Sequence, residues 1–157
     1  MQKVTTCLWF DNNAEEAVTF YTSLFKNSKV LEVARYGEAG PGPDDSVLTM
    51  RFQLDGVEIM ALNGGPAFKF TEAISLSVDC ESQAEVDELW EKLTADGGEP
   101  SQCGWLKDRF GLSWQIVPRA LIEMLGDPDP AKSKRVMEAM LKMTKIDTKV
   151  LQEAYAG

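Results

Sequence analysis

The sequence carries the same order of predicted elements twice, and this repeat constrains the fold more than any other feature. Residues 3–64 read as a strand, a helix and several further strands, and residues 73–118 repeat that order with little sequence identity. β-Branched and aromatic residues indicate the strands, and apolar residues at helical spacing indicate the helices. We therefore predict an α+β fold of two paired βαβββ modules, whose sheets form a half-open, barrel-like wall around a natural pocket.

Local signals predict where the two module helices begin. Ser82 and Glu85 have the spacing of a capping box, in which the serine side chain accepts a hydrogen bond from the backbone three residues later. Asn12 and Glu15 have the same spacing, with asparagine in the place of serine. We expect both pairs to cap their helices.

A predicted helical extension, residues 127–155, follows the second module. Asp129 and Pro130 give an N-cap followed by proline at the first helical position, and Asp147 is placed to cap a last helix. A Met-rich stripe recurs at helical spacing along the extension: Val136, Met137, Met140, Leu141 and Met143. Either the stripe packs against its own domain, or it forms a surface for a partner.

The composition is that of one soluble globular domain over residues 1–157, with 44% hydrophobic and 26% charged residues. The sequence has no apolar run as long as a membrane span, and its first residues lack the apolar segment of a signal peptide. Cys7, Cys80 and Cys103 are an odd and scattered set, which favours reduced thiols over a disulfide framework. We expect a cytoplasmic protein that does not bind a membrane.

The charge is strongly and unevenly negative. The net charge is −9, and residues 1–128 hold 10 basic and 21 acidic side chains, whereas residues 129–157 hold 6 basic and 4 acidic ones. An acidic body repels phosphate backbones, so we do not expect nucleic acid as a partner. The mildly basic extension either packs on the acidic body, packs on a second subunit, or is a solvated helix face.

The chain contains no histidine. This absence excludes a histidine general base, a Ser-His-Asp or Cys-His arrangement, and every metal site that depends on imidazole.

Four stretches together resemble the PhnB-like branch of the vicinal oxygen chelate superfamily, which includes glyoxalase I, extradiol dioxygenases, and fosfomycin and bleomycin resistance proteins. They are CLWFDNNAEEAVTFYTSLF, NGGPAFKFTEAISLSV, CGWLKDRFGLSWQIVP and VMEAMLKMTKIDTKVLQEAY, and the resemblance extends from Val4 to Tyr155. The resemblance implies paired βαβββ modules and a homodimer. The family is often labelled 3-demethylubiquinone-9 3-methyltransferase, but the sequence has no Gly-rich strand-to-helix turn suited to S-adenosylmethionine.

In metal-using members of the superfamily, four His, Glu or Gln ligands come from the first and last strand of each module. The resemblance places these positions near Thr5 or Thr6, near Met60, near Ala73 or Ser75, and at Gln115. Such neutral side chains suit a divalent cation poorly, because they do not offset the loss of its hydration. We therefore expect no cofactor, and a divalent metal is disfavoured.

The predicted ligand-binding residues of the pocket are Trp9, Asn63, Phe68, Ser75, Cys103, Trp105, Asp108, Trp114 and Gln115. Each has a second interpretation. The tryptophans form either an aromatic wall or part of the core. Gln115 either orients a carbonyl or hydroxyl group of a ligand or is satisfied by a neighbour.

Four of the other candidates also allow two interpretations. Asp108 is either a base or ligand acceptor, or a turn residue that binds the backbone before Phe110. Cys103 is either a nucleophile or a small buried side chain, and its thiol would need a positive neighbour to react. Asn63, with Phe68, forms either a pocket rim or a simple turn after a strand.

The function that these residues favour is binding of a small aromatic molecule without a functional metal site. One alternative is an enzyme of the superfamily, either a metal-dependent lyase, isomerase or dioxygenase, or the methyltransferase named in the family label. A third is a structural protein that acts through a dimer and the Met-rich extension. The sequence assigns no catalytic residue, and it leaves open whether the protein is an enzyme.

Overall fold

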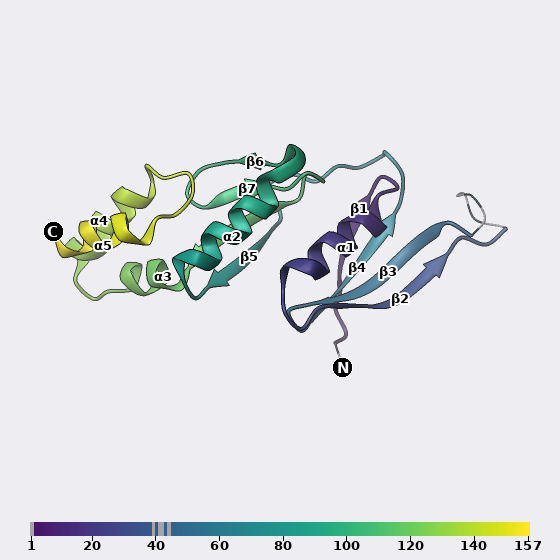
Figure 1. Ribbon diagram of the computed structural model, residues 1–157, viewed down its shortest axis with the longest axis horizontal. Coiled ribbons are helices and arrows are strands. Elements are labelled where there is room, and N and C mark those ends of the chain that lie inside the picture. Colours follow the sequence, from purple (N-terminus) through teal and green to yellow (C-terminus); the bar gives the residue numbers. More distant parts are fainter. Residues whose placement is uncertain (1, 39, 41–42, 44) are drawn as a thin grey trace. The chain divides into compact units, whose positions relative to one another are not determined.

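The computed structural model describes residues 2–38, 40, 43 and 45–157. The chain forms two compact units, Met1–Lys69 and Phe70–Gly157, which run from purple to blue and from teal to yellow in Figure 1. Within the described residues, no helix is both long enough and apolar enough to span a bilayer.

The first unit has the predicted βαβββ order. Its elements are β1 (Thr6–Phe10), α1 (Ala14–Leu24), β2 (Lys29–Arg35), β3 (Val47–Leu54) and β4 (Val57–Asn63). The strands form a mixed sheet in the order β1-β4-β3-β2, in which β1 and β4 are parallel and the other pairs antiparallel. The tight turn between β3 and β4 is Asp55-Gly56, where both residues have positive φ, as such hairpin turns require.

The second unit repeats this order. Its elements are β5 (Ser75–Cys80), α2 (Gln83–Thr94), the 3₁₀ turn η1 (Ala95–Gly97), β6 (Glu99–Pro100), β7 (Trp105–Lys107) and β8 (Ser113–Pro118). Its sheet has the order β5-β8-β7-β6, and β5 and β8 are again parallel. The predicted α+β class and the repeat are therefore confirmed, and over the described residues neither sheet closes into a barrel by itself.

One helix packs on one face of each sheet, and burial alternates accordingly along β4 and along most of β8. In the first unit, α1 buries Val18 and Tyr21 together with Phe52 and Ala61 of the sheet. In the second unit, the buried residues of α2 are Val86, Leu89 and Leu93. We call the opposite side of each sheet, which carries the half-exposed residues of each strand, its outer face.

The capping predictions had different outcomes. Ser82 caps α2, because its side chain accepts a hydrogen bond from the Glu85 backbone at 3.2 Å. The Asn12 prediction is wrong: α1 begins after Asn13, and Asn12 lies outside it with a φ of 69°. The N-terminal amide of α1 is instead satisfied by Asn63 of β4, a contact that local spacing could not show.

The extension consists of α3 (Arg119–Leu125), α4 (Pro130–Met140) and α5 (Thr148–Ala156), so a short helix precedes the predicted range. Asp129 and Asp147 cap α4 and α5, as predicted. These helices form a separate cluster, with the buried residues Leu121, Met124, Val136, Ile146 and Leu151. Of the Met-rich stripe, Met140 and Met143 pack against this cluster, whereas Met137 and Leu141 are exposed.

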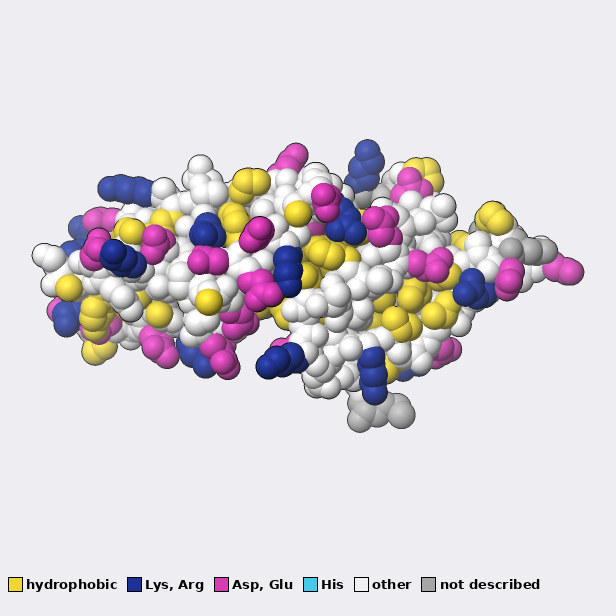
Figure 2. All heavy atoms as spheres, viewed as in Figure 1, with side chains coloured by type: hydrophobic (Ala, Val, Ile, Leu, Met, Phe, Trp, Pro, Cys, Tyr) yellow, Lys and Arg dark blue, Asp and Glu magenta, His cyan; other side chains and the backbone are white. Residues whose placement is uncertain are grey.

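Two basic side chains of the extension form contacts within the second unit. Lys145 forms an ion pair with Asp87 of α2 at 2.7 Å, and the Arg135 guanidinium donates hydrogen bonds to the carbonyls of Ala154 and Tyr155. In Figure 2 the acidic and basic side chains are interspersed at the left, where Figure 1 places α4 and α5. This mixture is typical of a solvated surface.

Candidate functional site

The outer face of the second sheet carries neutral polar groups and an aromatic ring. Gln115 of β8 lies opposite Ser77 of β5 and Trp105 of β7, so the three side chains share this face. The Gln115 side-chain amide donates a hydrogen bond to the Ser75 hydroxyl at 3.0 Å. Ser75, Trp105 and Gln115 are half-buried, whereas Ser77 is exposed. The row of Ser75, Gln115 and Trp105 can therefore present both a hydrogen-bonding pair and a flat ring to a small molecule.

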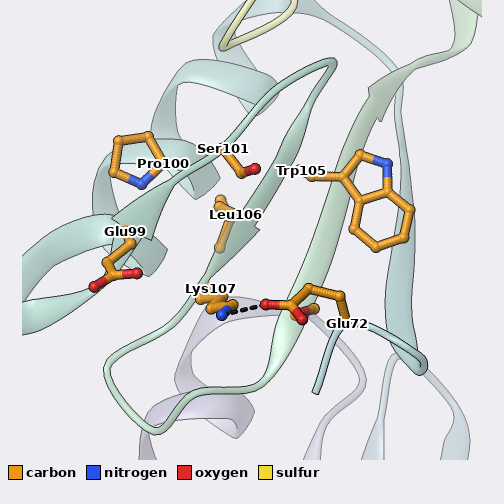
Figure 3. A pocket seen from close by; sticks show the side chains of 8 residues that line it. Glu72, Glu99, Pro100, Ser101, Trp105, Leu106 and Lys107 are labelled. Carbon is orange, nitrogen blue, oxygen red and sulfur yellow. Dashed lines mark ion pairs between the residues drawn. The ribbon is translucent and has the colours of Figure 1, made fainter. Parts of the chain in front are cut away.

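A cavity of about 210 Å³ borders the same face. It is lined by Glu72, Glu99, Pro100, Ser101, Trp105, Leu106, Lys107 and Ser113. Figure 3 shows the Lys107 ammonium directed at the Glu72 carboxylate, with which it forms an ion pair. This contact lowers the pKa of Glu72 below its usual value and raises the pKa of Lys107, and both groups are partly exposed to solvent.

Asp108 organises the turn between β7 and β8. Its carboxylate accepts hydrogen bonds from the backbone N–H groups of Phe110 at 2.8 Å and Leu112 at 3.1 Å. It also accepts a bond from the Trp114 indole N–H at 2.9 Å. Asp108 is buried, and Trp114 lies in the core beneath α2. These contacts fit the turn interpretation of Asp108 and the core interpretation of Trp114.

Cys103 and Gly104 form the loop that leads into β7, and both have positive φ. Their backbone N–H groups donate to the carbonyls of Met143 at 2.9 Å and Thr144 at 2.8 Å, in the segment between α4 and α5. Added at Gly104, a Cβ would lie 3.0 Å from both the Ile116 carbonyl and the Ile146 side chain, so the approach is close. The extension thus holds the loop that positions Trp105.

In the first unit, Trp9 and Phe68 form an aromatic pair. Their ring centroids lie 4.9 Å apart with an edge-to-face angle of 76°, and Phe68 is 64% exposed. The Trp9 indole N–H donates to the Gly65 carbonyl at 2.9 Å. Gly64 lies so close to the indole ring that an added Cβ would come within 2.3 Å of it. The turn after β4 therefore fixes the orientation of Trp9.

Asn63 lies on the helix-covered side of the first sheet, where both its amide oxygen and its amide nitrogen form hydrogen bonds. Its amide oxygen accepts from the Ala14 N–H at 2.9 Å, and its amide nitrogen donates to the Val47 carbonyl at 3.1 Å. The structure therefore brings Trp9 and Phe68 together in the first unit, and Ser75, Trp105 and Gln115 together in the second. Asn63, Asp108 and Trp114 use their side chains in structural hydrogen bonds, whereas the half-buried Cys103 is bonded through its backbone N–H.

The donor groups at the positions implied for a metal do not suit one. Ser75 and Gln115 are neutral and are hydrogen-bonded to each other. The nearby acids Glu58 and Glu72 form ion pairs with Arg51 and Lys107. No group of three or more His, Cys, Asp or Glu side chains that could hold a metal ion occurs in the part of the chain that is described.

Sequence reasoning did not select Ser113, Lys107 or Glu72 as site residues. Strand alternation places Ser113 on the same face as Gln115, since they are two residues apart in β8. The cavity itself was not predictable, because segments distant in sequence form its wall.

The comparisons with known proteins agree with this fold. The sequence model of the family described as 3-demethylubiquinone-9 3-methyltransferase matches residues 2–117. A PhnB protein from Bacillus cereus is 40% identical, with a TM-score of 0.68, and the match covers 74% of this chain and 99% of that one. None of the curated proteins compared with the chain matches it.

Two more distant structures show the fold alone. Protein PA1353 from Pseudomonas aeruginosa is 22% identical, with a TM-score of 0.61 and coverage of 75% of this chain and 98% of that one. The fosfomycin resistance protein FosX from Listeria monocytogenes, complexed with Mn(II) and sulfate, is 18% identical, with a TM-score of 0.54 and coverage of 80% and 97%. The family match and the PhnB relative show that the chain belongs to the PhnB-like family, described as 3-demethylubiquinone-9 3-methyltransferase.

Proposed function

We propose that this protein binds a small aromatic molecule on the outer face of its second sheet without the help of a metal ion. The observation that carries the proposal is the row of Trp105, Gln115 and Ser75 on the outer face of the second sheet, in which a half-buried ring lies beside a neutral hydrogen-bonding pair. Binding sites for small molecules combine a mostly apolar or aromatic wall with a few polar groups that orient the ligand.

The metal-free part of the proposal is supported by the chemistry of the donors. Divalent cations need charged or imidazole ligands to offset the loss of hydration. The chain has no histidine, and Gln115 already donates to Ser75. The proposal also includes a homodimer, which the resemblance to the superfamily supports, and a cytoplasmic location, which the odd and scattered set of cysteines supports.

Native mass spectrometry with and without zinc, nickel and manganese tests the metal and the oligomeric state together. We expect a dimer whose mass does not change with metal. One metal retained per chain at micromolar concentration would favour the alternative, a metal-dependent enzyme of the superfamily.

Ligand binding is tested by ligand-observed NMR with a panel of one- and two-ring aromatic compounds. We expect Trp105→Leu to weaken the binding of these compounds by at least about twofold, because an aromatic pair contributes about 0.5–1.5 kcal/mol beyond the buried area. Trp90→Leu is the matched control, since Trp90 lies on α2. If no compound binds the wild-type protein, the proposed function is wrong.

A further inference from the structure

The cavity beside Trp105 has one feature that points to the chemistry of its ligand. Ser113 lines the cavity and is only 1% exposed. Among the described residues, its hydroxyl oxygen is a buried side-chain polar atom without a hydrogen-bond partner. Buried polar groups are nearly always paired, so the Ser113 hydroxyl lacks the partner that such groups have, and a molecule bound in the cavity can supply it.

A second hydrogen-bonding group belongs to the residue that pairs with Ser113 across the two strands. Lys107 of β7 is directly opposite Ser113 of β8 in the antiparallel register, and side chains in such pairs have Cβ atoms about 4.5–5.5 Å apart. The Lys107 ammonium forms an ion pair with Glu72. An ammonium group has three N–H donors, so Lys107 can donate to a ligand oxygen and keep this ion pair.

The remaining wall favours a flat and uncharged ligand. Trp105 lies two residues before Lys107 in β7 and lines the same cavity, and Figure 3 shows its ring and the Glu72 side chain on the same side of the cavity. Glu72 and Glu99 outnumber Lys107, so an organic anion would be repelled. An organic cation would be repelled by the Lys107 ammonium if its charged group lay near the Ser113 hydroxyl.

We propose that this cavity binds an uncharged aromatic molecule that carries a hydroxyl or carbonyl oxygen. The oxygen lies between the Ser113 hydroxyl and the Lys107 ammonium, and the ring lies against Trp105. The volume of about 210 Å³ is below the roughly 300–1,000 Å³ of pockets for drug-sized ligands, which indicates one or two rings. This inference rests on the proposed function and names the ligand chemistry of the cavity that shares Trp105 with that row.

The test compares four matched probes by protein-observed NMR: p-cresol, toluene, 4-methylbenzoate and 4-methylbenzylammonium. We expect p-cresol to bind, to shift the Trp105 indole resonance, and to bind about fivefold to tenfold more tightly than the other three, as one or two hydrogen bonds would provide. Equal binding of p-cresol and toluene would overturn the inference, and so would a preference for either charged probe.

Variants locate the oxygen. We expect Ser113→Ala to weaken p-cresol about fivefold and to leave toluene unchanged. Lys107→Met changes a partly exposed side chain, so it gives the same selective loss even where Ser113→Ala does not fold. Ser133→Ala is the control, because Ser133 lies on α4 and does not line the cavity. Unchanged p-cresol affinity in both Ser113→Ala and Lys107→Met overturns the inference.

The outcomes separate this inference from the proposed function. If compounds of the aromatic panel bind through Trp105 but show no dependence on Ser113 or Lys107, only the assignment of the ligand oxygen is wrong. If neither the panel nor p-cresol binds the wild-type protein, both proposals are wrong.

Discussion

The buried carboxylate of Asp108 should be among the most sensitive positions of the second unit. It accepts at least three hydrogen bonds, from the backbone N–H groups of Phe110 and Leu112 and from the indole N–H of Trp114. Leu112 and Trp114 are themselves buried, so their N–H groups would find no water after the carboxylate is removed. Asp108→Ala therefore removes the acceptor of several donors at once.

The magnitude follows from these contacts. A hydrogen bond to a charged group contributes about 1.5–3 kcal/mol, and a buried donor left unpaired costs about 1–3 kcal/mol. Because such costs overlap within one network, we expect Asp108→Ala to lower the free energy of unfolding by about 3–5 kcal/mol, a large fraction of the roughly 5–15 kcal/mol of a typical domain. Asp108→Asn keeps one acceptor oxygen and replaces the other with an NH₂ group, which would face an N–H donor. We expect this variant to lower the free energy of unfolding by about 1–3 kcal/mol.

Urea unfolding followed by tryptophan fluorescence measures these changes, since Trp90, Trp105 and Trp114 all lie in the second unit. The free energies of the variants and the wild-type protein can be compared if the slope of the unfolding free energy against urea concentration is the same in each. Asp79→Asn is the control: this exposed carboxylate pairs with Arg119 at the surface, where an ion pair contributes about 0–1 kcal/mol. A loss below about 1 kcal/mol for Asp108→Ala would refute the structural role given to this carboxylate.

Three further predictions test other positions. Gly64→Ala should displace Trp9, change its fluorescence and cost about 1–3 kcal/mol of unfolding free energy, whereas Gly37→Ala, with open space around the added Cβ, should not; an unchanged Trp9 signal contradicts the packing. Asn63→Ala should cost about 2–4 kcal/mol in thermal or urea unfolding, because it leaves the Ala14 N–H and the Val47 carbonyl unpaired. Burial first, then the carboxylates of Glu85 and Asp79, raise the pKa of the Cys80 thiol from 9.0 to about 12. As the pH rises, the unfolded chain therefore loses this proton before the folded chain does. The contribution of the protonated thiol to the free energy of unfolding is complete below pH 9 and should fall between about pH 9 and 12. A Cys80→Ala variant whose free energy of urea unfolding declines equally over this range would contradict this.

Most of the fold was predictable because its signals are local. The cap residues Ser82, Asp129 and Asp147 act on backbone groups at most three residues away, so their spacing in the sequence is sufficient. The strand–helix–strand order follows from the period of the apolar residues, which is also local. Strand pairing is different: β1 pairs with β4 and β5 with β8 across most of each module, and only the repeat suggested such a closure.

The candidate site was predictable only in part, since burial depends on distant segments. The resemblance and the Gly-turn before β8 placed Gln115 firmly, and alternation then gives the face it shares with Ser113. Nothing in the local pattern shows that Ser113 is buried, because its surroundings include Glu72, which is far from it in sequence. The wrong prediction at Asn12 has the same origin: the residue that satisfies the start of α1 is Asn63, 49 residues from Ala14.

The extension shows how a site can depend on residues outside the family match. That match ends at residue 117, directly before the end of β8, so α3, α4 and α5 lie beyond it. Yet the carbonyls of Met143 and Thr144 accept the N–H groups of Cys103 and Gly104, immediately before Trp105. A ring that contacts a ligand is only as well oriented as the backbone that carries it. The orientation of Trp105 is therefore set jointly by the second module, which supplies the strand, and by the extension, which holds the loop before it.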